Sequence, residues 1–267
     1  MINLNTFKKS VLTCTYQVSQ IVILAQVFLA LIGIVYIYFK FSWWYVALPF
    51  VWYALLLWWS HHIALHRYFS HGAFDVNKFW HILMCYTSCL VSFGSPFSYA
   101  LAHRAHHKHS DTDKDTHAPT KIGYLNVMFF RWKLDSVNLL DRNRKIDKWA
   151  INAHQYYSLI IFAFYVCLLM IDIGLAFTYN IGILIALFGV AYVNVFSHVK
   201  NPLNYRNFET EDLSSNNLFV GIVGGEWHNN HHRYPNRWNE KVKWWELDIP
   251  AQIIKLIKKE ENGQEKI

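Results

Sequence analysis

The histidines gathered in three short clusters are the residues of this chain best suited to chemistry. The clusters read HRYFSH, HRAHH and HNNHH, and they contain His66, His71, His103, His106, His107, His228, His231 and His232. Imidazole is a preferred ligand of iron, copper and zinc. The clusters therefore predict a metal centre.

Spacing separates these clusters from scattered surface histidines, although fifteen histidines occur in 267 residues. In HxxHH the first histidine precedes the other two by three and four positions, so on a helix all three share one face. The HxxxxH spacing of His66 and His71 spans more than one helical turn and favours a helix end. Helices, and the end of a helix, must position these ligands.

The chain is 54% hydrophobic and only 16% charged, which is too apolar for an ordinary soluble domain. A membrane-spanning helix needs about 20 mainly apolar residues. Four segments meet this requirement, at roughly residues 20–39, 43–63, 156–177 and 181–196. A fifth apolar stretch, residues 79–102, contains Gly94, Pro96 and several polar residues, and this favours an interfacial helix.

Lysine and arginine are concentrated at the N-terminus, between residues 67 and 148, and after residue 200. They are sparse in the expected loops at 40–42 and 172–180, so both termini and all three clusters are predicted to face the cytoplasm. The first apolar run lacks a small-residue cleavage site and is expected to remain in the protein. We expect one domain, residues 1–267, with a cytoplasmic cap formed by residues 66–150 and 198–267.

The ordered set HxxxxH, HxxHH and HxxHH, with SDTDKDTH after the second cluster and WWELD after the third, resembles the membrane fatty-acid desaturase family. The resemblance is to its stearoyl-CoA desaturase-like branch and covers about residues 59–248. It implies an all-α integral membrane fold with about four transmembrane helices, interfacial helices and a helical cap that holds two iron ions. It also implies molecular oxygen as the oxidant and insertion of a cis double bond into a saturated acyl chain.

The resemblance also implies two further residues of the metal centre. In NVFSH, His198 matches a family ligand and Asn194 matches an asparagine that acts through a water. No catalytic residue outside the metal centre and no other cofactor is expected. Metal-binding histidines need an acceptor for the second ring N–H. The nearby candidates are Asp111, Asp113, Asp115 and Glu226.

Several alternatives remain open. We expect a delta-9 acyl-CoA desaturase, but acyl-CoA members carry an Arg-Asp pair where this chain has Leu101 and Ala102. Phospholipid-bound acyl chains are therefore the alternative substrate. His62 and His66 have the HxxxH spacing that suits related hydroxylases. A metal transporter is a third possibility, but it would need polar ligands near the bilayer midplane.

Substrate and electrons must both reach this centre. Aromatic candidates for lining an acyl tunnel are Trp58, Trp59, Phe97, Tyr99 and Trp227, and basic candidates for binding a phosphate are Arg131, Lys133, Arg142, Arg144 and Lys145. The chain has no iron–sulfur cysteine pattern and no dinucleotide-binding glycine motif, so we expect an external donor, a ferredoxin or a cytochrome b5-like protein with its reductase.

The expected setting is a lipid bilayer, as a multi-pass protein of a bacterial inner membrane. Nucleic acid is not expected as a partner, because the sequence lacks any recognition motif for it. The net charge of +7 is instead interpreted as a signal of orientation in the membrane, because the basic residues lie in the segments expected on the cytoplasmic side. Bond position, acyl length, oligomeric state and the role of His62 are left open by the sequence.

Overall fold

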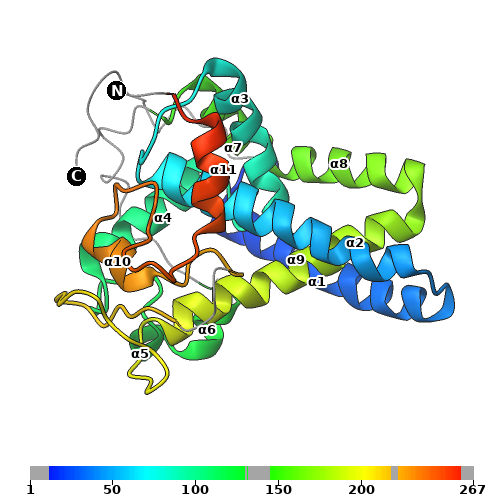
Figure 1. The fold of residues 1–267 in the computed structure, drawn as a ribbon. Coiled ribbons are helices and arrows are strands. Elements are labelled where there is room, and N and C mark those ends of the chain that lie inside the picture. The colour runs from blue at the N-terminus through cyan, green and yellow to red at the C-terminus, as the bar shows by residue number, and fades with distance from the viewer. Residues whose placement is uncertain (1–11, 130, 132–144, 218–221, 260–267) are drawn as a thin grey trace.

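The computed structural model describes residues 12–129, 131, 145–217 and 222–259, and these residues form helices joined by loops (Figure 1). Their only β-type pairings are two isolated bridges. The helices are α1 (Tyr16–Phe39), α2 (Trp43–Tyr53), the π-helix η2 (Ala54–Ser70), α3 (Lys78–Thr87), the 3-10 helix η3 (Ser88–Val91), α4 (Pro96–His109), α5 (Pro119–Ile122), α6 (Tyr124–Met128), α7 (Lys148–Gln155), α8 (Tyr157–Ile171), α9 (Ile173–Phe196), α10 (His228–Arg233) and α11 (Ile249–Ile257).

Three helices are long and apolar enough to cross a membrane: Gln17–Phe39, Trp43–Ser70 and Ile173–Phe196. They run side by side in the right half of Figure 1, with α9 packed against both α1 and α2. Most of the shorter helices gather at the other end of the molecule, whereas α8 lies in the same half as the long ones. The all-α membrane fold expected from the sequence is thereby confirmed.

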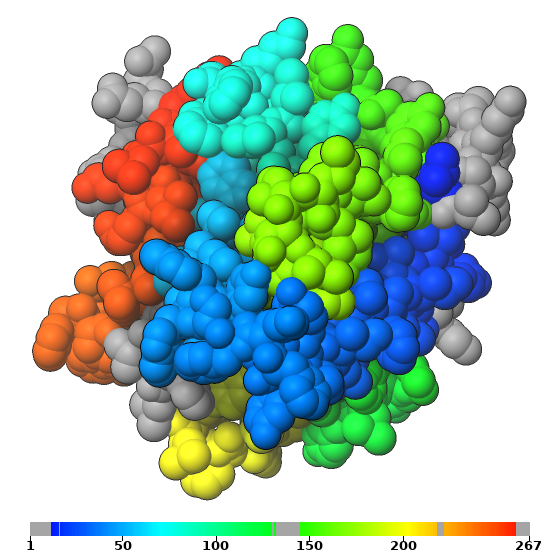
Figure 2. Space-filling model, turned by 90° about the vertical axis from the view of Figure 1, so that its right-hand side faces the viewer, coloured from blue at the N-terminus to red at the C-terminus, as the bar shows by residue number. Residues whose placement is uncertain are grey.

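The long helices present apolar side chains outward. On α1, Ile21, Leu24, Phe28 and Leu31 recur at helical spacing and are each more than half exposed. An apolar surface of this kind, on helices of spanning length, is suited to lipid contact. Figure 2 views the end of the bundle where α1 turns into α2, with α8 lying beside them.

The second span is longer than predicted. The sequence places its end at residue 63, but α2 continues through η2 to Ser70. The first histidine cluster is therefore part of the same continuous helical rod as the span, and His71 directly follows its last residue. The rod itself positions the cluster.

The predicted boundary between the third and fourth spans is wrong. The sequence indicates a loop at residues 172–180, but α8 ends at Ile171 and α9 begins at Ile173. Asp172 is the cap between them, and its Oδ1 accepts a hydrogen bond from the backbone N–H of Leu175 at 2.7 Å. A capping carboxylate satisfies one of the unpaired amides at a helix start, so the backbone reverses within a single residue.

The polar residues that suggest a loop are paired inside the bundle. Thr178 accepts a hydrogen bond from Trp52 Nε1, and Tyr179 donates its hydroxyl to the Leu90 carbonyl. Asn180 donates to the side chain of Gln26 on α1. Because buried polar groups with partners cost little, these residues belong inside α9.

The third expected span involves two helices, α7 and α8, that meet at a sharp bend. Helix α8 has 15 residues and joins α7 at an angle of 72°. The pair makes a fourth span only if its two halves are counted together. The expected span of residues 156–177 therefore corresponds to a shorter helix, α8, that ends at Ile171.

The apolar stretch at residues 79–102 does not form one span. It is divided among α3, η3 and the first half of α4. The division falls at Ser92 and Gly94, which have φ values of 67° and 125°, and Pro96 then opens α4. Ser95 and Ser98 form a reciprocal capping box at this start, which sets where the helix of the second cluster begins.

Candidate metal centre

Four elements bring the predicted histidines together. The η2 helix carries His66 and is followed directly by its C-cap His71, α4 carries the second cluster, and α10 carries the third. His198 lies two residues beyond the end of α9. These segments are far apart in the sequence, yet their imidazoles form two compact groups.

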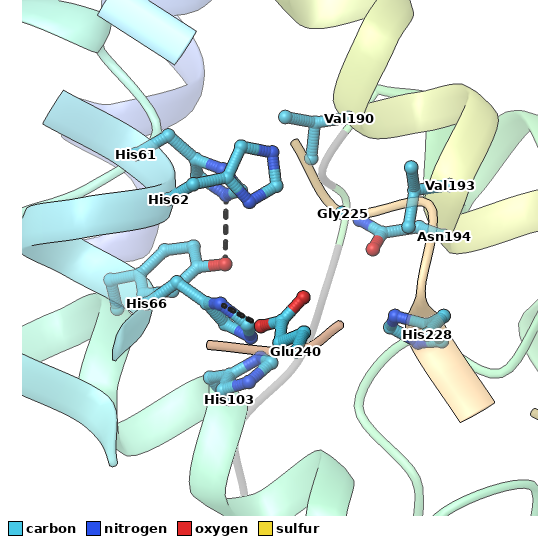
Figure 3. A pocket seen from close by; sticks show the side chains of 11 residues that line it. His61, His62, His66, His103, Val190, Val193, Asn194, Gly225, His228 and Glu240 are labelled. Carbon is cyan, nitrogen blue, oxygen red and sulfur yellow. Dashed lines mark hydrogen bonds and ion pairs between the residues drawn. The ribbon is translucent and has the colours of Figure 1, made fainter. Parts of the chain in front are cut away.

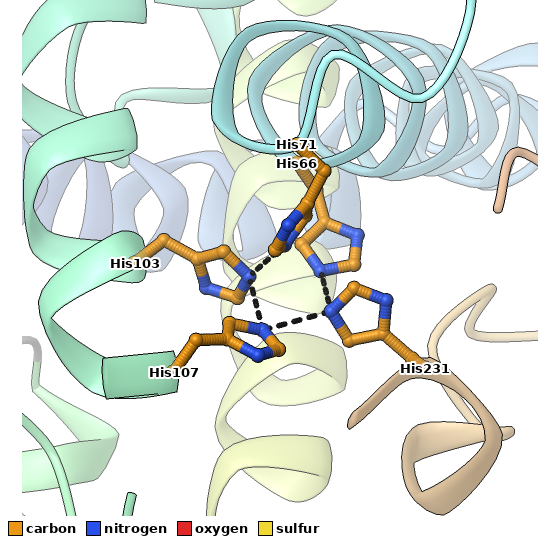
Figure 4. Close-up of side chains that lie close together, drawn as sticks. All are labelled: His66, His71, His103, His107 and His231. Atoms are coloured by element: carbon orange, nitrogen blue, oxygen red, sulfur yellow. Dashed lines mark hydrogen bonds between the residues drawn. The ribbon is translucent and has the colours of Figure 1, made fainter. Parts of the chain in front are cut away.

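The first group has five members: His66, His71, His103, His107 and His231. Their Nε2 atoms converge, as Figure 4 shows. His103 Nε2 lies 2.8 Å from His71 Nε2 and 3.1 Å from His107 Nε2. His231 Nε2 lies 2.9 Å from His107 Nε2 and 3.0 Å from His66 Nε2.

The second group has four members: His106, His198, His228 and His232. His228 Nε2 lies 2.8 Å from His198 Nε2 and 3.0 Å from His232 Nε2. His106 Nε2 is buried and has no hydrogen-bond partner among the described residues. All nine histidines predicted as ligands thus belong to one group or the other.

Carboxylates orient the rings of the second group from behind. His106 Nδ1 contacts both oxygens of Asp115 at 2.9 Å, and His198 Nδ1 lies 3.0 Å from Asp111 Oδ2. His232 Nδ1 lies 2.6 Å from Asp212 Oδ2. A carboxylate at Nδ1 keeps the proton on that nitrogen and leaves a lone pair on Nε2.

A buried ionic network lies behind two rings of the first group, at longer distances than in the second group. Glu240 Oε1 lies 3.3 Å from His231 Nδ1 and 3.8 Å from His66 Nδ1. Arg67, which is fully buried, donates to Glu240 at 3.1 Å and to both oxygens of Asp248 at 2.9 Å. The arginine compensates the two buried carboxylates, which allows Glu240 to stand behind the histidines.

This arrangement of nitrogen lone pairs suits cations. The Nε2 lone pairs of His198 and His232 both face His228 Nε2, and one neutral imidazole has only one proton to donate. Hydrogen bonding therefore cannot satisfy the group, whereas a metal ion can accept every lone pair. The two groups of donors fit two metal ions.

Burial keeps the rings in the form that binds metal. Desolvation lowers the pKa of His103, His107, His228 and His232 well below the usual value, and neighbouring imidazoles lower it further. Burial by itself would raise the pKa of Asp115, but its hydrogen bond with His106 brings the pKa below the usual range. Neutral imidazoles held by ionised carboxylates are the states that metal coordination requires.

A pocket lies against the centre (Figure 3). His66, His103 and His228 of the metal groups line it, together with Asn194 of α9 and Tyr99 of α4. Asn194 therefore lies beside the centre. His61 and His62 also line the pocket, although neither belongs to a metal group.

Sequence reasoning identifies some supporting residues and misses others. Of the four candidate acceptors, Asp111 contacts His198 and Asp115 contacts His106, both in the second metal group. Asp113 instead pairs with Lys121, and Glu226 accepts the backbone amides of Val223 and Gly224. Asp212 and Glu240, which contact His232 and His231, are missed because nothing in their sequence spacing marks them as partners of these histidines.

Of the aromatic candidates, one lines the pocket and the others have contacts elsewhere; the basic candidates do not all lie within the described residues. Tyr99 lines the pocket, whereas Trp58, Trp59 and Trp227 donate their indole N–H groups to Ile222, Thr87 and Leu247. Phe97 packs against the His154 ring. Lys145 pairs with Asp75, while Lys133, Arg142 and Arg144 lie outside the described residues.

Comparison with known proteins gives a consistent result. Residues 41–256 match the family model described as fatty acid desaturase. A chloroplast protein of Arabidopsis thaliana, named as a probable lipid desaturase, is 30% identical over 73% of this chain and 56% of its own length. A delta-9 acyl-lipid desaturase of the same plant is 27% identical over 73% of this chain and 66% of its own length.

An acyl-CoA 5-desaturase of Anemone leveillei is 26% identical over 82% of this chain and 70% of its own length. The protein thus spans little more than half the length of the first of these relatives and about two thirds of the other two.

Proposed function

Because the protein belongs to the fatty acid desaturase family, we propose that it is an oxygen-dependent oxidoreductase that inserts a cis double bond into a saturated acyl chain. The observation that carries this proposal is the pair of histidine groups, five and four residues, at the end of a bundle of apolar helices. In the reaction, one O2, two electrons and two protons combine with the two hydrogens taken from the substrate to give two waters.

We assign two iron ions to the two groups. His66, His71, His103, His107 and His231 would hold one, His106, His198, His228 and His232 would hold the other, and Asn194 would act through a water. The irons supply the oxidising power, which the reaction needs because a methylene group within a saturated acyl tail has no acidic proton to remove.

The protein's own residues orient and enclose the centre. Asp115, Asp111 and Asp212 hold the Nδ1–H groups of three ligands, and Glu240 faces Nδ1 of His231 and of His66. Because the first and third clusters are largely buried, bulk water is kept from the ligands. Ligand positions fixed by such contacts need little reorganisation when substrate arrives.

The substrate class is proposed as acyl-CoA, with delta-9 selectivity, and phospholipid-bound acyl groups are the alternative. The named relatives include both acyl-lipid and acyl-CoA desaturases. The sequence lacks the Arg-Asp pair of acyl-CoA members, with Leu101 and Ala102 in its place. Hydroxylation gains no support, because His62 belongs to neither metal group.

We further propose that the protein spans a bacterial inner membrane with its histidines on the cytoplasmic side. The basic residues that flank the apolar helices support this orientation. Electrons would then come from a cytoplasmic ferredoxin or a cytochrome b5-like protein with its reductase.

Expression in a host that lacks desaturases of its own tests the proposal. Unsaturated fatty acids should appear with the wild-type protein and disappear with His103→Ala or His231→Ala, while the protein still inserts into the membrane. His109→Ala is the matched control, because His109 lies on α4 outside both groups. Near wild-type product from the cluster variants would refute the metal assignment.

The same host distinguishes the substrates. Membranes supplied with labelled acyl-CoA or with labelled phospholipid should desaturate only the class that the protein uses. Conversion of phospholipid without acyl release, with acyl-CoA untouched, would overturn the acyl-CoA assignment and leave the desaturase assignment intact.

A further inference from the structure

A second set of metal-binding side chains lies where α3 meets the start of α7. His81 and Cys85 are four residues apart on α3 and share one face, and Asp147 is the residue that caps α7. One donor atom from each lies within 4.8 Å of the others. No member of this set belongs to the nine-histidine centre.

The distances resemble those between ligands of one ion. His81 Nε2 lies 3.6 Å from Cys85 Sγ and 3.1 Å from Asp147 Oδ1. Tetrahedral bonds of about 2.3 Å to sulfur and about 2.0 Å to nitrogen or oxygen place such donor atoms about 3.3–3.6 Å apart. The observed spacing is close to that expected around zinc.

The other nitrogen of His81 already has a partner. Nδ1 lies 2.9 Å from the Tyr68 hydroxyl on η2. If Nδ1 donates its proton to that oxygen, Nε2 presents a lone pair toward Cys85 and Asp147, the tautomer that a metal requires.

The surroundings allow an ion to enter and to be held. Cys85 is fully buried, while the side chain of Asp147 is 39% exposed and opens the set to solvent. Asp147 Oδ1 accepts the amides of Trp149 and Ala150, which fixes the carboxylate in place. Burial raises the pKa of the Cys85 thiol, so ion binding would displace its proton to solvent and would strengthen as pH rises.

We propose that His81, Cys85 and Asp147 bind one divalent ion of the zinc class, with a fourth position left to water. Thiolate, imidazole and carboxylate together are a donor set that zinc accepts readily. The bound ion joins α3 to α7, the first helix of the bent α7–α8 pair.

Cobalt titration of the full-length protein, purified in detergent and stripped with a chelator, tests this proposal. Co²⁺ bound to a thiolate gives a charge-transfer absorption, and the nine-histidine centre contains no sulfur. The wild type should therefore develop one equivalent of this band. Cys85→Ser should abolish it, and Cys167→Ser should retain it, because Cys167 belongs to no ligand group among the described residues.

Two further variants separate a metal site from a packing contact. Asp147→Asn keeps a good helix cap but removes the charge, and it should weaken cobalt binding by about tenfold or more. Tyr68→Phe removes only the partner of Nδ1 and should weaken binding by about 10–100-fold. Absence of the band in the wild type, or its persistence in Cys85→Ser, would overturn the proposal. Unchanged affinity in Asp147→Asn would remove that residue from the site.

Discussion

Asp115 joins a ligand to the loop that follows it. Its carboxylate contacts His106 Nδ1 at 2.9 Å and accepts the backbone amides of Asp111 and His117. Asp115→Ala should therefore lower metal affinity by about 10–100-fold, as expected when the acceptor behind a histidine ligand is lost. Metal content after dialysis against a graded chelator measures this loss.

Asp113→Ala is the matched control for that measurement. Asp113 lies in the same loop, but it is exposed and pairs with Lys121. Exposed pairs of this kind contribute little, so its metal content should equal that of the wild type. If both variants lost metal equally, disruption of the loop, and not loss of the Asp115–His106 contact, would explain the lower metal affinity.

Glu246 provides a residue with a defined pH dependence. It is fully buried and accepts hydrogen bonds from Tyr205, Asn207 and Asn230. Burial by itself would raise its pKa, but hydrogen bonds from the amides of Lys243 and Val242 and from the side chains of Tyr205 and Asn207 bring the pKa below the usual value.

Because the folded-state pKa is lower than the unfolded one, Glu246 stabilises the fold above about pH 4.3 and loses that effect as pH falls through the folded pKa. Glu246→Gln should cost about 1.5–3 kcal/mol at pH 7, with the difference from the wild type shrinking below about pH 4. Thermal unfolding in detergent across this range measures it. The control is Glu209→Gln at an exposed position; a pH-independent deficit in Glu246→Gln would contradict the argument.

Among the elements, the contact between α2 and α9 depends on small residues. A Cβ added at Gly182 would lie 2.4 Å from Trp52 Cβ, a distance that requires the helices to move apart. At Gly189 the nearest atom would be Leu57 Cδ2 at 3.2 Å, the end of a flexible side chain.

Gly182→Ala should therefore destabilise the bundle by about 1–3 kcal/mol, whereas Gly189→Ala should have a smaller effect. The yield and thermal midpoint of the folded protein in detergent compare the two. If both variants behaved alike, close packing at Gly182 would not be what joins α2 to α9.

At the scale of the whole molecule, the orientation in the membrane can be tested by labelling. Phe41 lies in the turn between α1 and α2, and Lys241 lies in the loops near the metal groups; both are exposed. In a Cys167→Ser background, a membrane-impermeant thiol reagent should label Phe41→Cys in intact cells and Lys241→Cys only after lysis. The opposite pattern would place the histidine clusters outside the cytoplasm.

The sequence alone predicted the class of fold and the nine histidines that the structure gathers into two groups. The regular spacing of histidines predicts which side chains share a helical face, and long apolar runs predict membrane-spanning helices. Both predictions are possible because they depend only on the local sequence. Nothing in the sequence, however, divides nine histidines into groups of five and four. That division places His107 apart from its neighbour His106, which faces the other group.

The contacts that hold the histidine rings and the buried polar residues form only in the folded protein. Glu240 stands behind His66 and His231, and Asp212 stands behind His232, because the loops that carry these carboxylates fold against the helices that carry the histidines. The sequence predicts the turn after the third span but makes it too long, since Thr178 and Asn180 suggest a loop unless Trp52 and Gln26 satisfy them. The free-energy cost of burying a polar group depends on whether it has a hydrogen-bond partner. These partners come together only in the folded protein.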